Sequence, residues 1–235
     1  MKELFHVHTY RCKHAGDERE IEYVKRAIEL GASRITFTDH APFPGNPFGH
    51  RMQMEELDDY IDTLVSLRDK YAGQIDIKIG LETEFLPRYW DYYKELKSNP
   101  NIDILLLGQH MYAIGKNKYS FSLPYEQLVV EECRDLSMAI KLGILSEFFD
   151  AVAHPDRVFR KRRVWDDETK QYAIGIIDAA VEKSIPLEMN ESSKLEEYHF
   201  WPEFWDLAKE RGAKIIHGLD AHSVSELRFI AEEGE

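Results

Sequence analysis

Residues 4–39 read LFHVHTYRCKHAGDEREIEYVKRAIELGASRITFTD, and this stretch indicates how the whole chain folds. Its two ends are short runs of apolar, β-branched and aromatic side chains, which are typical of strands. Between them Ile21, Val24 and Ile28 recur at the spacing of one helix face, and Gly31 is a typical residue at a helix end. The stretch therefore predicts a strand, a helix and a second strand parallel to the first.

The alternation of strands and helices continues along the rest of the chain. The predicted strands cover residues 4–8, 34–39, 75–82, 102–109, 150–154, 185–190 and 214–220. Apolar residues recur at helical spacing around residues 57–67, 128–140, 174–181 and 204–212. Seven strand–helix units predict an α/β fold, a parallel (β/α)7 barrel with one unit fewer than the eight-stranded barrel. An open doubly wound sheet is the alternative, although the glycine-rich phosphate loop after the first strand is absent.

Composition and charge exclude several classes of protein. There are 30 Lys and Arg against 43 Asp and Glu, and the formal net charge of −13 argues against nucleic-acid and anionic-membrane partners. The sequence contains no run of about 18 apolar residues, so no membrane-spanning helix is predicted. The first residues do not resemble a signal peptide. Cys12 and Cys133 cannot build a disulfide framework. We expect one cytoplasmic domain over residues 1–235, with Cys12 in a loop and Cys133 in a helix core.

Residue types that bind metals stand at the carboxyl ends of six of the seven predicted strands. His6 and His8 are two residues apart and share one face of the first strand, so both imidazoles can bind one cation. The other strand ends carry Asp39-His40, Glu82, Gln109-His110, His154-Pro155 and Asp220-Ala221-His222. In a parallel barrel the carboxyl ends of the strands meet at one rim, where the active sites of such folds lie.

A cluster of imidazoles and carboxylates on apolar strands is costly to bury unless it is paired, and divalent metal ions pair with it well. The sequence therefore predicts a metal site at this rim. Glu84 shares a strand face with Glu82 and is an alternative ligand. His50 and His199 are interpreted as surface or capping residues, and His217 as a core residue.

Five of the seven residues 157–163, RVFRKRR, are basic in an otherwise acidic chain. A solvated basic loop is one interpretation. The other is that one guanidinium in this run binds the oxygens of a phosphate in a bidentate manner. Arg160 is the candidate for that role.

The blocks HVHT, FTDHAPFP, GLE, GQH, AHPD and GLDAH follow one another between His6 and His222. In these blocks the chain resembles the polymerase-and-histidinol-phosphatase (PHP) superfamily of metal-dependent phosphoesterases, and within it the histidinol-phosphate phosphatases. The resemblance covers essentially the whole chain. It implies a distorted seven-stranded (β/α)7 barrel of the PHP type, with three divalent metal ions at the carboxyl rim.

The resemblance also implies which residues bind each ion. By motif, the ligand sets are His6, His8, Glu82 and Asp220 for the first ion, Glu82, His110 and His154 for the second, and His14, His40 and His222 for the third. His14 lies in a loop where Asp17 or Glu18 is an alternative ligand. Zinc, manganese and iron all suit these nitrogen and oxygen ligands.

The activity that the resemblance implies is hydrolysis of a phosphomonoester, either L-histidinol phosphate in histidine biosynthesis or another small phosphorylated metabolite. A hydroxide that bridges two ions, beside Glu82, would attack phosphorus while the cations offset the charge on the phosphate oxygens. A metal-dependent amidohydrolase, which also begins with H-x-H, and a non-catalytic interaction module are the alternatives. The absence of lysine at the middle strand ends and the complete series of blocks favour the phosphatase.

Overall fold

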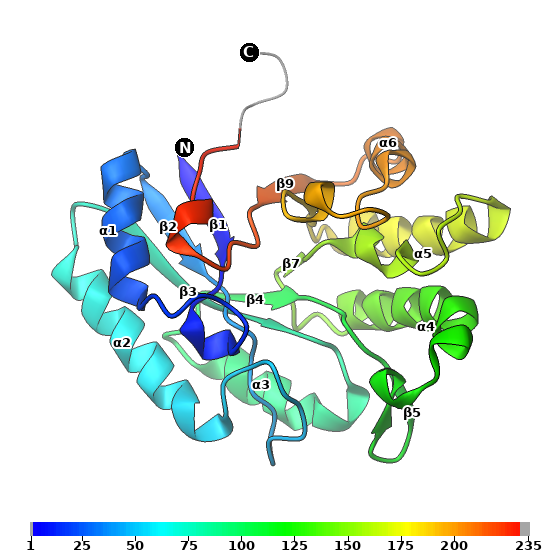
Figure 1. Cartoon of the computed structure of the whole chain (residues 1–235), viewed down its shortest axis with the longest axis horizontal. Helices are drawn as coiled ribbons and strands as arrows, with labels where there is room; N and C mark the ends of the chain where they lie inside the picture. Colours follow the sequence, from blue (N-terminus) through cyan, green and yellow to red (C-terminus); the bar gives the residue numbers. More distant parts are fainter. Residues whose placement is uncertain (1, 231–235) are drawn as a thin grey trace. The chain divides into compact units, whose positions relative to one another are not determined.

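The computed structural model describes residues 2–230, and most of the predicted elements are present in it (Figure 1). Within these residues the main sheet consists, in order, of β1 (Glu3–Val7), β2 (Arg34–Phe37), β3 (Asp76–Thr83), β4 (Ile104–Leu107), β7 (Ala151–Val152), β8 (Leu187–Asn190) and β9 (Ile215–Gly218). Every predicted strand is therefore confirmed, with bounds that differ from the prediction by at most two residues.

The chain folds as two compact units. Unit 1 contains residues 2–82, 94–105 and 217–230, and unit 2 contains residues 83–93 and 106–216. The helices are α1 (Glu20–Leu30), α2 (Leu57–Lys70), α3 (Trp90–Ser98), α4 (Tyr125–Leu145), α5 (Asp167–Lys183) and α6 (Pro202–Glu210). Within the described part of the chain, none of them combines the length and the apolar character needed to cross a membrane.

In unit 1 the first three strands pair in parallel, β1 with β2 and β2 with β3. Leu4, Ile35 and Ile77 are neighbours in this register, and all three side chains are completely buried. The helices α1 and α2 lie beside these strands, and α1 contacts β2 (Figure 1). The first helix ends at Gly31 as predicted, because a φ of 75° lets the Gly31 N–H bond to carbonyls of the last turn.

The segment that follows β9 pairs with β1, the first strand of the chain. Leu219 N donates a hydrogen bond to the Phe5 carbonyl over 2.9 Å, and His8 N donates to the Ala221 carbonyl over 2.8 Å. Val7 and Ala221 form a parallel bridge between the two segments. The strand order thus begins at β1 and returns to it, which confirms the predicted α/β barrel with seven parallel strands.

In unit 2 the end of β4 pairs in parallel with β7, and β7 pairs in parallel with β8. The two long helices of this unit, α4 and α5, pack against each other. The start of α5 is fixed by Asp166, whose side chain accepts a hydrogen bond from Thr169 N over 2.9 Å. This cap satisfies one of the amide groups that a helix start leaves without a helical partner.

The structure differs from the sequence prediction at three places. The helix α3 and a two-stranded hairpin, β5 (Ala113–Gly115) with β6 (Lys118–Tyr119), were not predicted. All three residues of β5 are exposed, so this strand lacks the apolar alternation that would reveal it. The prediction that His217 is a core residue is wrong, because its side chain on β9 is exposed to solvent.

Candidate metal centre

Four of the predicted ligands, from three separate segments of unit 1, converge on one point. The Nε2 atoms of His6 and His8 are 3.0 Å apart, and each lies 3.3 Å from Oε2 of Glu82. Oδ1 of Asp220 is 3.6 Å from the His6 Nε2 and 3.3 Å from the His8 Nε2. All four side chains are buried. The structure thus brings together every residue of the first ligand set.

These spacings suit a single bound cation. An ion with four tetrahedral ligands at about 2.0–2.2 Å places neighbouring ligand atoms about 3.3–3.6 Å apart. The measured separations of 3.0–3.6 Å match that geometry closely. Two buried carboxylates and two imidazoles packed this tightly need a positive charge among them, which a divalent ion supplies.

The backbone is strained at two of these ligands. His6 has a φ of 67° and Asp220 a φ of 54°, values in the left-handed region that few residues other than glycine adopt. The pairing of β1 with β2 shifts register between Leu4 and Val7, on either side of His6. His6 and His8 therefore meet through a local irregularity rather than through the regular alternation of a strand. Such strain persists where the surrounding structure enforces it, often at functional sites.

A second cluster in unit 1 consists of His14, His40 and His222. Nδ1 of His14 lies 2.9 Å from the carbonyl oxygen of Cys12, and Nδ1 of His222 lies 2.9 Å from that of Asp220. A carbonyl oxygen can only accept, so each Nδ1 donates and each neutral ring presents a lone pair at Nε2. The two Nε2 atoms are 3.1 Å apart. Two lone pairs directed at each other are an arrangement that a shared cation stabilises.

Glu82 connects the two clusters. A parallel bridge pairs the backbones of His40 and Glu82, and Nδ1 of His40 lies 3.2 Å from the Glu82 Oε2. The same oxygen is 3.3 Å from the Nε2 atoms of His6 and His8. One fully buried carboxylate oxygen is therefore surrounded by three imidazoles, the position expected of a ligand shared between ions.

The electrostatic environment of His8 favours positive charge. Burial disfavours protonation of its ring, but the nearby side chains of Asp220, Cys12 and Glu82 outweigh this effect and raise the His8 pKa well above its ordinary value. The environment that attracts a proton to this ring also attracts a metal cation.

Polar contacts outside the two clusters hold the ligand-bearing loop in place. Asp39, completely buried next to His40, accepts hydrogen bonds from Thr9 N at 2.8 Å and Thr9 Oγ1 at 3.0 Å. Burial raises the pKa of Asp39 to about 7. The buried guanidinium of Arg11 pairs with the Glu20 carboxylate at 2.5 Å. These contacts attach residues 9–11 to the segment that follows β2 and to the start of α1.

Two further predicted ligands lie together in unit 2. The ring centroids of His110 and His154 are 5.1 Å apart, and Nδ1 of His110 lies 3.2 Å from Oε1 of the buried Glu84. His154 has a φ of 31°, and its backbone N donates to Oε2 of Glu188 over 3.2 Å. Glu84, weighed as a rival of Glu82 in the sequence, is instead the partner of His110.

The basic segment after β7 is mostly paired. The guanidinium of Arg160 contacts Oε1 of the buried Glu132 at 3.1 Å, and Lys161 contacts the same carboxylate at 2.9 Å. Burial, together with the positive charges of Arg157 and Arg160, lowers the pKa of His199 to about 4.

One residue near the candidate metal ligands was not predicted from the sequence to be a ligand. Cys12, expected as a loop thiol, is completely buried, and its sulfur forms a group with ligand atoms of His8 and His222. Its signal in the sequence is the spacing H-x3-C-x-H, which ends at His14. Among the described residues, the groups whose ligand atoms lie close enough to hold one ion include Cys12 and His14 from this loop. They do not include the alternatives Asp17 or Glu18.

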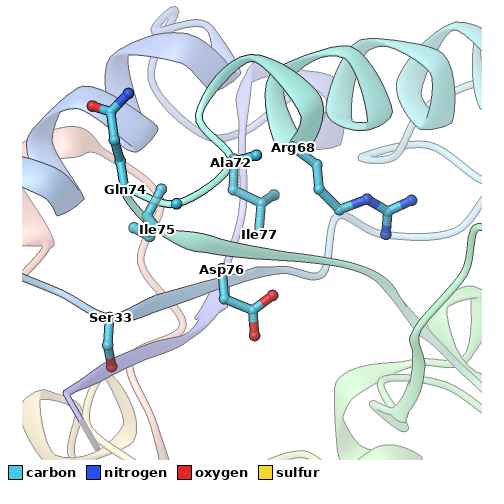
Figure 2. Close-up of a pocket in the computed structure, with 8 residues that line it drawn as sticks. Ser33, Arg68, Ala72, Gln74, Ile75, Asp76 and Ile77 are labelled. Carbon is cyan, nitrogen blue, oxygen red and sulfur yellow. The ribbon is translucent and has the colours of Figure 1, made fainter.

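Unit 1 also has a surface hollow of about 490 Å³ at the other ends of its strands (Figure 2). It is lined by Ser33, Asp76 and Ile77 at the amino ends of β2 and β3, and by residues around the end of α2. Neither histidine nor cysteine is present in this lining. None of the candidate metal ligands lines this hollow.

Comparison with known proteins connects this arrangement to a family. A family model described as PHP domain matches residues 5–192. A "Probable histidinol-phosphatase" of Deinococcus radiodurans is 29% identical over 233 residues, covering 95% of this chain and 87% of the relative. The "Histidinol-phosphatase" of Bacillus subtilis is 24% identical over 260 residues, covering 97% of this chain and 96% of the relative.

Two solved structures have the same fold. A chain from Listeria monocytogenes superimposes with a TM-score of 0.77 at 21% identity, covering 96% of this chain and 97% of the other. The histidinol phosphate phosphatase of Lactococcus lactis, solved with zinc, L-histidinol and phosphate, gives a TM-score of 0.74 at 22% identity. That match covers 95% of this chain and 87% of the Lactococcus chain.

Proposed function

The chain belongs to the PHP domain family, and we propose that it is a metal-dependent phosphomonoesterase that hydrolyses L-histidinol phosphate to L-histidinol and phosphate. The observation that carries this proposal is the convergence of His6, His8, Glu82 and Asp220, with their ligand atoms 3.0–3.6 Å apart. The names of the relatives and the molecules bound to the Lactococcus enzyme support the choice of substrate. The reaction would serve histidine biosynthesis.

The proposed centre holds three divalent ions. The proposed ligand sets are His6, His8, Glu82 and Asp220, then Glu82, His110 and His154, then His14, His40 and His222. Zinc is our first choice because the Lactococcus enzyme was solved with it, and manganese and iron suit the same ligands. When bound, the ions lower the pKa of a water to provide the nucleophile and offset charge on the phosphoryl group.

Side chains of the protein would position the ions and the phosphate of the substrate. Glu82 and Asp220 contribute the negative charge that keeps cations close together, and the carbonyl oxygens of Cys12 and Asp220 orient two imidazoles. We assign Arg160 to the phosphate oxygens of the substrate, since a guanidinium binds two of them at once. The net charge of −13 fits a small-molecule substrate better than a nucleic acid. Two free, buried thiols fit a reducing compartment such as the cytoplasm.

The test is release of inorganic phosphate from a panel of phosphomonoesters that includes L-histidinol phosphate, with metal analysis of the same protein sample. We expect bound transition metal and the highest kcat/KM on L-histidinol phosphate. Activity confined to other esters would change the substrate and retain the enzyme class. Lactone or amide hydrolysis without phosphate release would identify an amidohydrolase and overturn the proposal.

Arg160→Ala tests the substrate contact separately. We expect a higher KM for L-histidinol phosphate with unchanged metal content, because the side chain would bind the substrate and not the ions. Arg134→Ala is the matched control, since Arg134 is an exposed arginine paired with Asp135 on α4. A KM that responds equally to both substitutions would remove Arg160 from the site.

A further inference from the structure

The sulfur of Cys12 lies among the imidazoles of the candidate metal centre. Its Sγ and the ligand nitrogens of His8 and His222 all lie within 4.8 Å of one another. We propose that the Cys12 thiolate is an additional ligand of the metal centre, at the ion that His14 and His222 bind. This inference rests on the proposed function, because it requires that the centre holds ions.

The local backbone directs Cys12 into the cluster. Residues Tyr10–Cys12 form a single 3-10 turn, and Lys13 follows with a φ of 66°. This reversal is accompanied by the contact of 2.9 Å between Nδ1 of His14 and the Cys12 carbonyl. The turn therefore presents the Cys12 sulfur and the His14 ring together, two residues apart in the sequence. The Cys12 thiol donates to the Thr9 carbonyl over 3.2 Å, and a ligating thiolate would release that proton.

A second observation points to a ligand at the same place. The His8 ring is completely buried, and its Nε2 contacts the other members of the first cluster. Its other nitrogen, Nδ1, is buried and has no hydrogen-bond partner in the described part of the chain. Leaving the buried His8 Nδ1 without a partner lowers the stability of the fold. A coordinating group close to this nitrogen would reduce that free-energy cost.

The two cysteines of the chain, although equally buried, have opposite environments. The Cys12 sulfur lies within 4.8 Å of the ligand nitrogens of His8 and His222. Cys133, on α4, belongs to none of the groups of described residues that could hold a metal ion. The thiolate is the form of cysteine that binds metals, and the surroundings place Cys12, not Cys133, where it could do so.

A thiolate would change the metal preference of this ion. Soft sulfur ligands favour zinc over magnesium and manganese, while imidazole and carboxylate ligands discriminate among these metals less strongly. We therefore expect the ion near Cys12 to be zinc. The remaining ligand sets, which contain nitrogen and oxygen alone, would accept a wider range of metals.

Cobalt substitution tests the inference without relying on activity. Co²⁺ replaces zinc in such sites, and a thiolate ligand adds a charge-transfer band in the near ultraviolet to the visible d–d bands. We expect both kinds of band in the cobalt-loaded wild-type protein and in Cys133→Ser. In Cys12→Ser we expect the visible bands to persist and the near-ultraviolet band to disappear.

The outcomes separate this inference from the proposed function. Visible bands without a near-ultraviolet band in the wild type, or a near-ultraviolet band that survives in Cys12→Ser, would overturn the thiolate ligand and leave the phosphatase intact. If no cobalt binds at all, both proposals fail together. As a second measurement, zinc analysis after dialysis against a weak chelator should show at least about 10-fold weaker retention of one ion in Cys12→Ser. Retention equal to that of Cys133→Ser would also contradict the inference.

Discussion

The imidazole rings of His14 and His222 are oriented by the same kind of hydrogen bond to the backbone. In each case Nδ1 donates to the carbonyl oxygen of the residue two positions earlier, Cys12 for one ring and Asp220 for the other. Metal-binding histidines usually have such a partner on the second nitrogen, which fixes the tautomer and the direction of the lone pair. Here the backbone itself supplies both partners. The orientation of these rings is therefore built into the turns that carry them.

Glu82 is the side chain whose loss should have the largest effect on metal binding. Its Oε2 lies 3.2–3.3 Å from nitrogens of His6, His8 and His40, so Glu82→Gln removes a charge shared by both clusters. We expect phosphatase kcat/KM to fall by more than about 100-fold, the upper end of the effect of losing an outer partner, together with bound metal.

The matched control for Glu82→Gln is Glu95→Gln, which changes an exposed glutamate of α3. Phosphate release and metal analysis on both variants give the comparison. A Glu82→Gln protein that retains all of its metal would show that this carboxylate is not a ligand.

His199 makes the stability of the protein depend on pH. Its pKa in the folded state is about 4, below the unfolded value of about 6.5, because burial and the charges of Arg157 and Arg160 disfavour protonation. Between these two values the unfolded chain binds a proton that the folded chain does not, so stability falls as the pH falls through this window. His199→Gln removes this contribution.

We therefore expect His199→Gln to gain stability relative to the wild type between pH 7 and pH 5. Urea unfolding at several pH values measures the difference. His217→Gln, which removes an exposed imidazole on β9, is the matched histidine control. Parallel curves for the wild type and His199→Gln would contradict the assignment.

At the scale of elements, Gly80 allows the strands that carry the ligands to approach closely. It lies in β3, two residues before Glu82, and accepts a hydrogen bond from Tyr60 OH through its carbonyl at 2.8 Å. A Cβ at this position would lie 2.9 Å from the Phe37 carbonyl oxygen and 3.0 Å from that of Ile104. Neither backbone atom can move without displacing a neighbouring strand.

Gly80→Ala should consequently destabilise the protein by about 1–3 kcal/mol, the usual cost of overpacking. It should also lower metal affinity, because Glu82 would be displaced with the strand. Gly175→Ala is the control: Gly175 lies in α5 with open space around it, and alanine there stabilises a helix by up to about 1 kcal/mol. Thermal unfolding of both variants measures the contrast, and equal melting temperatures would refute it.

The alternation of strands and helices could be predicted from the sequence, because strand and helix periodicity are local properties. The strands and the candidate ligands at their ends could be predicted directly, since a histidine after an apolar strand is visible without knowing its neighbours. The position of Cys12 could not, because it depends on the reversal at Lys13. The pairing of Arg160 with Glu132 could not be predicted either, since Glu132 lies on α4, 28 residues earlier in the chain. The exposure of His217 on β9 could not be predicted, because it depends on tertiary packing that the local sequence pattern does not show.

At the scale of the whole molecule, bound metal should contribute to stability. The buried carboxylates and imidazoles of unit 1 lie close together, and burying them in this way is costly unless cations lie among them. A ligand at 100 times its Kd stabilises the folded state by about 2.7 kcal/mol, which for a chain of this size corresponds to about 5–10 °C.

We expect treatment with a strong chelator to lower the melting temperature by about that amount and to abolish phosphatase activity. Addition of zinc should restore both. Calorimetry of treated, untreated and reloaded samples makes the measurement. A melting temperature that does not change when metal analysis shows complete removal would mean that the buried ligands are stable without cations.

The pairing of the segment after β9 with β1 has a consequence for the order of events during synthesis. His6 in β1 and His8 just after it leave the ribosome early, whereas their partner Asp220 follows much later, and His14 and His222 are 208 residues apart. A nascent chain would therefore present His6 and His8 before their partners have been made. Loading of the proposed centre would follow completion of the chain.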